Sequence, residues 1–321
     1  MTDPLTQRMV FLLSVWAAVI LLSIALSPHF LQGSTLSYLL QYVPIIGVLG
    51  IAQTVVMLSG GPGIDLSVGA VMSLTGLAIA GLFAAGMPLV LACLAGLLLG
   101  AALGAINAVL ICVLNVPSLM ATLATMFTYG GLALALTGGS PIGGLPDWFA
   151  VLAQGRVLGI PNHLWLIFAP IAAALHVILS HTITGAHIYA SGNDETAAYL
   201  SGVQVAALRF RLYVLSGCLS SVAAIMTLSW FQTARPDAGQ GMELLSVTVA
   251  VLGGSHIFGG IGRISGTVVA VLIVTTLQAG LQLANISQAW QLGAMGVLLI
   301  GSVIADDMVR DRLRGRLAGL A

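Results

Sequence analysis

Charged residues are the scarcest component of this 321-residue sequence. Only 6% of its residues are charged, whereas 59% are hydrophobic and the mean hydropathy is +1.08. A soluble domain needs roughly a quarter of its residues charged, so the composition excludes a soluble protein. It predicts an all-α, polytopic membrane protein. No linker and no low-complexity tract divides the chain, so we expect a single transmembrane domain over residues 1–321.

Lysine is absent altogether, and all ten basic residues are arginine. A P-loop needs a lysine to contact the phosphates of a nucleotide. The sequence therefore excludes ATP binding by that route.

Cysteine and histidine are too few and too scattered to build a metal or catalytic centre. The three cysteines, Cys93, Cys112 and Cys218, are isolated in apolar runs, and the six histidines form no paired ligand pattern. No nucleophile stands beside a base in a recognisable arrangement. We therefore expect no metal, no cofactor and no enzymatic activity in this chain.

Apolar runs fill most of the chain, and a run of about 20 residues is long enough to cross a bilayer as a helix. Ten crossings are predicted, with one or two broken helices among them, because the run that begins at Leu244 is short. The first run is expected to remain as an uncleaved helix, since its signature for signal-peptide cleavage is weak and further spans follow. The predicted spans are Met9–Ser27, Leu36–Leu58, Leu66–Gly86, Leu89–Leu114, Ser118–Thr137, Asn162–Ser180, Phe210–Phe231, Leu244–Phe258, Ser265–Ala284 and Gln288–Ile304.

The arginines are distributed unevenly about these ten crossings. Only Arg156 and Arg235 fall on the side away from the chain ends. Because cytoplasmic loops carry an excess of basic residues, both termini are expected in the cytoplasm of a bacterial inner membrane. The eight arginines on that side are Arg8, Arg209, Arg211, Arg263, Arg310, Arg312, Arg314 and Arg316.

The stretch from His181 to Arg211 is more polar than the apolar runs on either side of it and is expected on the cytoplasmic side. Within it Asn193 is predicted to cap a helix of about two turns that Gly202 stops. Asp194 and Glu195 suit the positive end of its dipole. So short a helix needs support, and it either packs on its own loops or docks on a soluble partner. The cytoplasmic location favours docking; the segment comprises Gly192 to Gly202, with small residues at Ala197, Ala198 and Ser201.

A glycine-rich motif, SGGPGIDLSVG at Ser59–Gly69, interrupts the apolar runs. Two interpretations of Asp65 stay open: it caps the third span, or it is a polar point on a substrate pathway at a broken helix. Gly63, Ser67 and Gly69 of the same motif are further candidates for residues that line the pathway or break the helix. A fainter copy, GGIGRISG at Gly259–Gly266, is either an internal repeat or a coincidence in a glycine-rich protein.

Other polar residues are isolated within apolar helices or exposed on the outer side. Asn107, Thr122 and Thr125 either form hydrogen bonds between helices or line a pathway. Arg235, Asp237 and Glu243 belong to an external turn that is either a solvated loop or a docking rim for an external binding protein.

Four stretches together resemble the permease subunits of bacterial ABC sugar importers of the ribose, xylose and autoinducer-2 type. The resemblance covers nearly the whole chain. Its motifs are GIDLSVG at Gly63–Gly69, ASGNDETAAYLSGV at Ala190–Val203, GQGMELLSVTVAVLGGSHIFGG at Gly239–Gly260 and, more weakly, GAINAVLICVLNVPSLMATLATM at Gly104–Met126.

The resemblance implies about ten transmembrane helices and import of a monosaccharide or a similar small molecule. It also implies cytoplasmic ATP-binding subunits that hydrolyse ATP, a second permease copy or paralogue, a periplasmic solute-binding protein, lipid contact and no nucleic acid. The segment Gly192–Gly202 then resembles the coupling helix that binds the ATPase. The alternative is a stand-alone ion-coupled transporter, which needs intramembrane carboxylates or histidines; only Asp65 and Glu243 come near this requirement.

Overall fold

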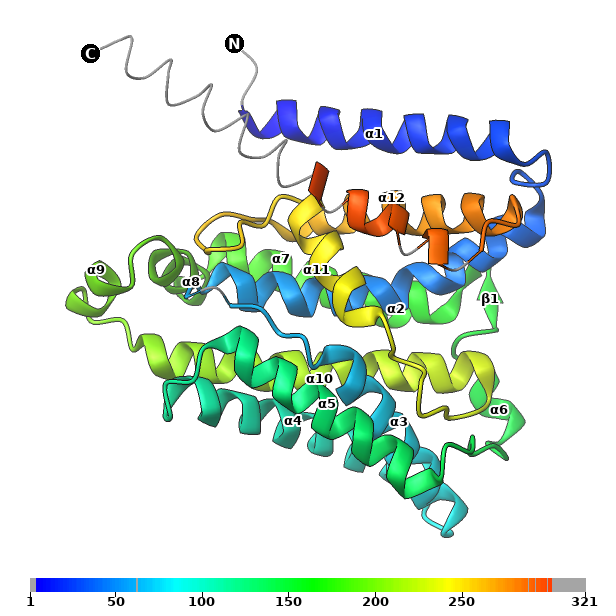
Figure 1. Cartoon of the computed structure of the whole chain (residues 1–321), viewed down its shortest axis with the longest axis horizontal. Helices are drawn as coiled ribbons and strands as arrows, with labels where there is room; N and C mark the ends of the chain where they lie inside the picture. The colour runs from blue at the N-terminus through cyan, green and yellow to red at the C-terminus, as the bar shows by residue number, and fades with distance from the viewer. Residues whose placement is uncertain (1–3, 62, 288, 292, 299, 302–321) are drawn as a thin grey trace.

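The computed structural model describes residues 4–61, 63–287, 289–291, 293–298 and 300–301. Most of its long helices lie roughly along one common direction, horizontal in Figure 1. Seven helical segments within the described ranges are long and apolar enough to cross a membrane, which confirms the all-α, polytopic prediction. They are α1 (Pro4–Leu26), α2 (Gly33–Leu58), α4 (Leu89–Cys112), α5 (Ser118–Thr137), a π-helical turn η1 (Leu164–Phe168) that continues as α7 (Ala169–His181), α10 (Val205–Phe231) and α12 (Ile264–Leu283).

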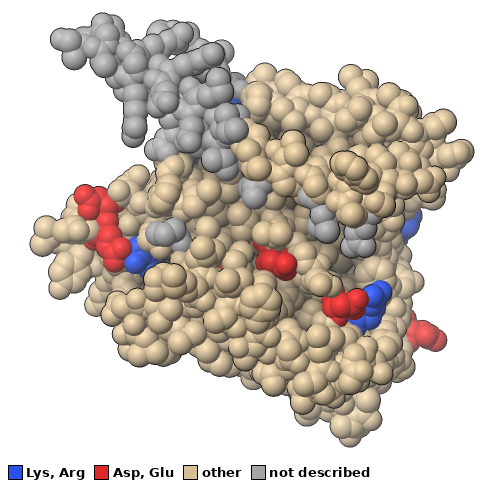
Figure 2. Space-filling model, viewed as in Figure 1, with Lys and Arg blue, Asp and Glu red and all other residues tan. Residues whose placement is uncertain are grey.

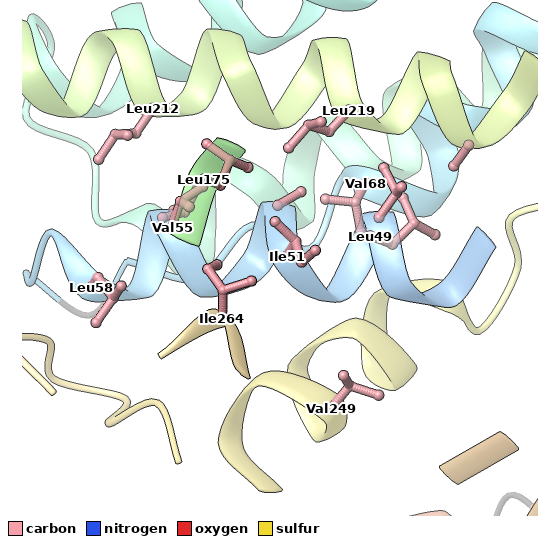
Figure 3. Packing of buried hydrophobic residues seen from close by; sticks show 14 of the residues in the cluster. Leu49, Ile51, Val55, Leu58, Val68, Leu175, Leu212, Leu219, Val249 and Ile264 are labelled. Atoms are coloured by element: carbon pink, nitrogen blue, oxygen red, sulfur yellow. The ribbon is translucent and has the colours of Figure 1, made fainter. Parts of the chain in front are cut away.

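The long helices divide into a buried group and a peripheral group. Within the most apolar windows, 78% of the residues of α2 and 72% of those of α10 and α12 are buried, against 11% for α1 and 17% for the η1–α7 segment. Figure 3 shows α2 at the centre of the packing, with Leu212 and Leu219 of α10 on one side and Val249 and Ile264 on the other. The peripheral helices turn apolar side chains outward, as lipid-facing helices do.

Glycine lets α4 approach α10 closely. Gly100 and Gly104 of α4 lie against the backbone of α10 at Gly217 and Tyr213, where a Cβ atom would collide. Small residues four apart are the usual means by which membrane helices bring their backbones together. The close α4–α10 pairing is therefore encoded in the glycine spacing.

The apolar helix α11 (Met242–Leu252) is too short to cross a membrane alone, in agreement with the broken helix predicted for the run that begins at Leu244. It has 11 residues, or about 16 Å at 1.5 Å per residue, whereas α3 (Val68–Ala84) has 17, or about 26 Å, which is the lower limit for a transmembrane helix. The predicted eighth span to Phe258 is wrong at its end, because the helix stops at Leu252 and turns follow. The predicted tenth span lies only partly within the described residues.

Each end of the bundle carries its own small elements. Helices α8 (Ile183–Asn193) and α9 (Glu195–Leu200) form one end, while α6 (Asp147–Ala150) and the strands β1 (Arg156–Val157) and β2 (Ile160–Pro161) form the other (Figure 1). The strands pair antiparallel as a short hairpin. The connection between α2 and α3 starts at the α9 end, where Gly60 packs on Gly192.

Candidate functional site

The carboxylate of Asp65 is buried, 1% exposed, in the connection between α2 and α3. Its Oδ1 atom accepts hydrogen bonds from the Ser67 backbone N–H (3.0 Å) and the Ser67 hydroxyl (2.7 Å), and its Oδ2 atom accepts one from the Ser216 hydroxyl (2.7 Å). A buried charge is costly unless it is hydrogen-bonded. Three donors therefore stabilise this carboxylate, one of them from α10.

The hydrogen bonds continue from Ser67 into two further helices. Asn107 of α4 donates through Nδ2 to the Ser67 hydroxyl (2.7 Å), and Thr125 of α5 donates to Asn107 Oδ1 (2.7 Å). Thr122 of α5 donates to the carbonyl of Ile64, 3.2 Å away. The structure thus brings the predicted residues Asp65, Ser67, Asn107 and Thr122 together in one buried network that joins α3, α4, α5 and α10.

The predicted capping role of Asp65 needs a correction. The residue that precedes the first turn of α3 is Ser67, and no side chain caps that helix. Asp65 instead closes the turn ahead of it, through the bond from the Ser67 N–H. The two motif glycines, Gly63 and Gly69, sit where their backbones contact the Val56 and Gly239 carbonyls, so neither position has room for a side chain.

Helix α9 begins one residue later than predicted. Asp194, and not Asn193, is the cap: its Oδ1 atom accepts a hydrogen bond from the Ala197 N–H at 2.9 Å. Asn193 is instead the last residue of α8, a helix that the sequence did not suggest. The predicted stop is confirmed, because Gly202 follows the helix in the left-handed region with φ of 88°.

The outward face of α9 also differs from the predicted one. Ala198 is only 4% exposed and packs on its own protein, so it is not part of a docking surface. Tyr199 and Leu200 are 70% and 79% exposed, and Ala197 and Ser201 are exposed beside them. The segment therefore presents two large side chains beside the small Ala197 and Ser201 at the tip of the molecule.

Arg209, near the start of α10, holds α9 in place. Its guanidinium donates to both carboxylate oxygens of Glu195, at 3.1 and 2.7 Å, and to the carbonyl of Ser59 at 3.3 Å. In Figure 2, acidic and basic atoms meet at the left end, where Figure 1 places α8 and α9, and the rest of this face carries only a few small charged groups.

A junction of four glycines lies just behind α9. Gly60, Gly192, Gly259 and Gly260 bring the end of α2, the end of α8 and the loop before α12 into backbone contact, and the Gly260 N–H donates to the Leu58 carbonyl at 3.1 Å. The two similar motifs noted in the sequence therefore touch one another. Each follows one helix and precedes another, α2 to α3 and α11 to α12.

The predicted external rim separates into two parts. Arg235 and Asp237 form an exposed ion pair at 2.7 Å, and the hydrogen bonds and charge of the guanidinium lower the pKa of Asp237. Glu243 is half-buried: its Oε1 atom accepts a bond from the Gly241 N–H (3.1 Å), and its other oxygen faces Gly69 of α3. Glu243 thus belongs to the break between α10 and α11 and contacts the start of α3.

Comparison with known proteins decides the family. Over residues 35–303 the sequence matches the family described as the permease component of the branched-chain amino acid transport system. The chain belongs to this permease family. The match contains every predicted site residue, from the network around Asp65 to α9 and Glu243.

Relatives of the permease align with it almost from end to end. It is 38% identical over 307 residues to the ribose import permease protein RbsC of Bacillus subtilis (strain 168), which covers 95% of this chain and 94% of that protein. The ribose import permease protein RbsC of Escherichia coli (strain K12) is 35% identical over 303 residues, covering 92% of each. The autoinducer 2 import system permease protein LsrD of Salmonella choleraesuis (strain SC-B67) is 36% identical over 294 residues, covering 89% of this chain and 87% of that protein. No solved structure gives a significant match.

From the sequence, three residues of the permease that take part in these contacts were assigned no role at the site. Arg209 was counted only as a cytoplasmic charge, and Ser216 and Gln53 were not singled out. Gln53 of α2 accepts a bond from the Asp65 N–H at 3.3 Å. A usable indication existed for α10, where Arg209 and Ser216 are spaced seven residues apart and so lie on one helical face.

Proposed function

We propose that this permease is the membrane-spanning subunit of an ABC importer for a monosaccharide of the ribose class or a sugar-like molecule such as autoinducer-2. ATP hydrolysis on cytoplasmic partner subunits drives the transport. The observation that carries the proposal is α9: a short helix at the tip of the bundle whose large side chains, Tyr199 and Leu200, are 70% and 79% exposed. An exposed aromatic and aliphatic pair at the end of a membrane bundle suits a protein partner.

The arginines support a cytoplasmic position for α9. Arg209 contacts α9 directly, Arg211 follows two residues later, and Arg8 and Arg263 line one cavity near the start of α1 at the same end. Arg156 lies at the opposite end, where it donates to Ser37 near the start of α2. This asymmetry follows the positive-inside rule and supports a cytoplasmic N-terminus; with the ten predicted spans, the C-terminus would lie there too.

The remaining partners follow from the same assignment. A second permease copy or paralogue and membrane lipid cover the exposed apolar sides of the peripheral helices. A periplasmic solute-binding protein docks on the outer end, near the Arg235–Asp237 pair, and delivers the substrate. Relatives named for ribose and for autoinducer-2 both align over most of the chain, which supports a small polyhydroxylated substrate.

A stand-alone ion-coupled transporter is the alternative. Such a carrier needs an intramembrane carboxylate that is open to the coupling ion. Both oxygens of Asp65 instead accept hydrogen bonds from Ser67 and Ser216. The geometry of Asp65 therefore favours a passive permease over a carrier that binds its coupling ion at this residue.

Reconstitution tests the proposal directly. Tagged permease would be purified with the ATPase and binding protein that co-purify with it, and labelled ribose and autoinducer-2 uptake would be measured in proteoliposomes. We expect uptake of one of these substrates only when ATP, ATPase and binding protein are all present. Uptake driven by a proton or sodium gradient without ATP would contradict the proposal and support the alternative.

A further inference from the structure

Two side chains of helix α10 form hydrogen bonds with the α2–α3 connection. Arg209 donates to the Ser59 carbonyl at the start of the connection, and Ser216 donates to the Asp65 carboxylate near its end. The two residues are seven apart, which is two helical turns, so both side chains project from one face about 10 Å apart. Helix α10 therefore contacts the connection at its start and near its end.

The guanidinium of Arg209 also reaches the proposed docking helix. It bonds both oxygens of Glu195, as described above, and the turn at Gly61 lies directly against it. Arg209 is 15% exposed and Glu195 is 54% exposed, so the pair is partly shielded from water on the arginine side. A planar, forked guanidinium can hold a carboxylate and a carbonyl at once, which an ammonium group does less well.

Two sets of polar contacts are therefore joined by the two helical turns of α10 between them. One set links Glu195 of α9, Arg209 and Ser59, and the other links Ser216 with Asp65. From Asp65 the second set continues through Ser67 and Asn107 to Thr125 of α5. The contacts of Arg209 and Ser216 thus connect α9, through α10, to the broken helix at the centre of the bundle.

We propose that Arg209 is a positioning residue that couples α9 to the α2–α3 connection during transport. The proposal rests on the docking role of α9 proposed above. When the ATPase moves α9, the Arg209 guanidinium moves the connection and α10 with it, so that ATP hydrolysis is converted into opening of the pathway. Without this contact the ATPase still binds and hydrolyses ATP, but the central helices do not follow.

The test measures the coupling ratio, the substrate molecules imported per ATP hydrolysed, in the same proteoliposomes. The variants are Arg209→Gln, Arg209→Lys, Glu195→Gln and the charge swap that combines Arg209→Glu with Glu195→Arg. Arg211→Gln is the matched control, since Arg211 is exposed on the same helix, two residues away. Glu195→Gln changes an exposed side chain, so it keeps the test valid if the arginine variants fold poorly.

We expect Arg209→Gln to keep the ATPase bound while the coupling ratio falls at least about five-fold. This factor corresponds to the lower end of typical coupling free energies between two sites of a protein. Arg209→Lys and Glu195→Gln lower it less, and Arg211→Gln leaves it unchanged. The charge swap restores none of it, because a glutamate side chain at position 209 has no donor for the Ser59 carbonyl. A purely structural role would reduce the amount of complex but not the ratio per complex. An unchanged ratio in Arg209→Gln and Glu195→Gln, loss of the ATPase from Arg209→Gln, or a charge swap that restores the ratio would overturn the proposal. Failure of the proposed function is distinguishable, because the unmodified permease would then show no ATP-dependent uptake.

Discussion

The short helix α9 and the network around Asp65 are two polar regions of a largely apolar chain, and their polar groups differ in how far the fold buries and pairs them. The Asp65 carboxylate is 1% exposed and its oxygens are occupied by donors from two segments of the same chain. Helix α9 has only six residues, a cap from Asp194 and one ion pair from Arg209, and it exposes its largest side chains. In a membrane protein, polar residues that the fold satisfies hold the helices together, and those it leaves exposed are available to partners.

The largest expected effect is on folding, from Asp65→Leu. This change leaves the Ser67 N–H, the Ser67 hydroxyl and the Ser216 hydroxyl without their acceptor. Each buried polar group left unpaired costs about 1–3 kcal/mol. We expect the amount of folded permease in the membrane to fall to near zero, measured by fluorescence-detected size exclusion of a tagged protein.

Asp65→Asn is the matched control, because the amide oxygen can still accept from Ser67 and the Ser216 hydroxyl can accept from the amide. We expect near-normal abundance. Normal uptake in Asp65→Asn would limit Asp65 to structure, while loss of uptake at normal abundance would show that its charge serves the pathway. Equal abundance and activity of the Leu and Asn variants would contradict the network as the element that holds the fold together.

The second effect falls on partner binding and not on folding. Leu200→Asp places a charge in the proposed interface, and central hot-spot residues contribute about 2 kcal/mol or more, or roughly thirty-fold in affinity. We expect the ATPase to be lost from the purified complex at normal permease abundance. Ala198→Trp should behave in the opposite way: it overfills a buried position and lowers abundance. ATPase retention by Leu200→Asp at the normal level would remove α9 as the docking site.

Glu243→Gln is expected to have a smaller effect, on the rate of transport. Glu243 is half-buried at the start of α11 and faces the start of α3, so its carboxylate belongs to the broken-helix region. We expect the maximal uptake rate to fall while the concentration of binding protein that gives half-maximal uptake is unchanged. The reverse pattern would return Glu243 to the docking rim that the sequence suggested.

The smallest effect is expected from Arg235→Glu on the outer end. Exposed ion pairs contribute only about 0–1 kcal/mol, and rim charges mainly set the rate of encounter. Half-saturation by the binding protein should rise at low salt, and the difference should shrink near 0.15 M, where screening acts within about 8 Å. A half-saturation that does not change at low salt would leave this turn as a solvated loop.

The positions of α9 and of the polar network around Asp65 along the chain could largely be predicted from the sequence, but their side-chain contacts could not. Composition and apolar runs predicted the long helices, and the glycines and Pro62 predicted the break before Asp65. Local patterns could not show that Ala198 faces inward, because its orientation depends on packing against the rest of the bundle. For the same reason Glu243 was grouped with Arg235 by proximity along the chain, while the half-length α11 places it beside Gly69. The contacts of Arg209 with Ser59, 150 residues away, have no local signature either.

The most direct measurement of the central claim is labelling of a single cysteine on α9. Leu200→Cys and Leu158→Cys, in a permease whose three native cysteines are replaced by serine, place thiols on positions that are 79% and 96% exposed at opposite ends of the bundle. With a membrane-impermeant maleimide, we predict that Leu200→Cys reacts only in inside-out vesicles and is protected when the ATPase is bound. Leu158→Cys should react only in right-side-out vesicles, with or without the ATPase. Labelling of Leu200→Cys from the outside, or with no protection by the bound ATPase, would contradict the account.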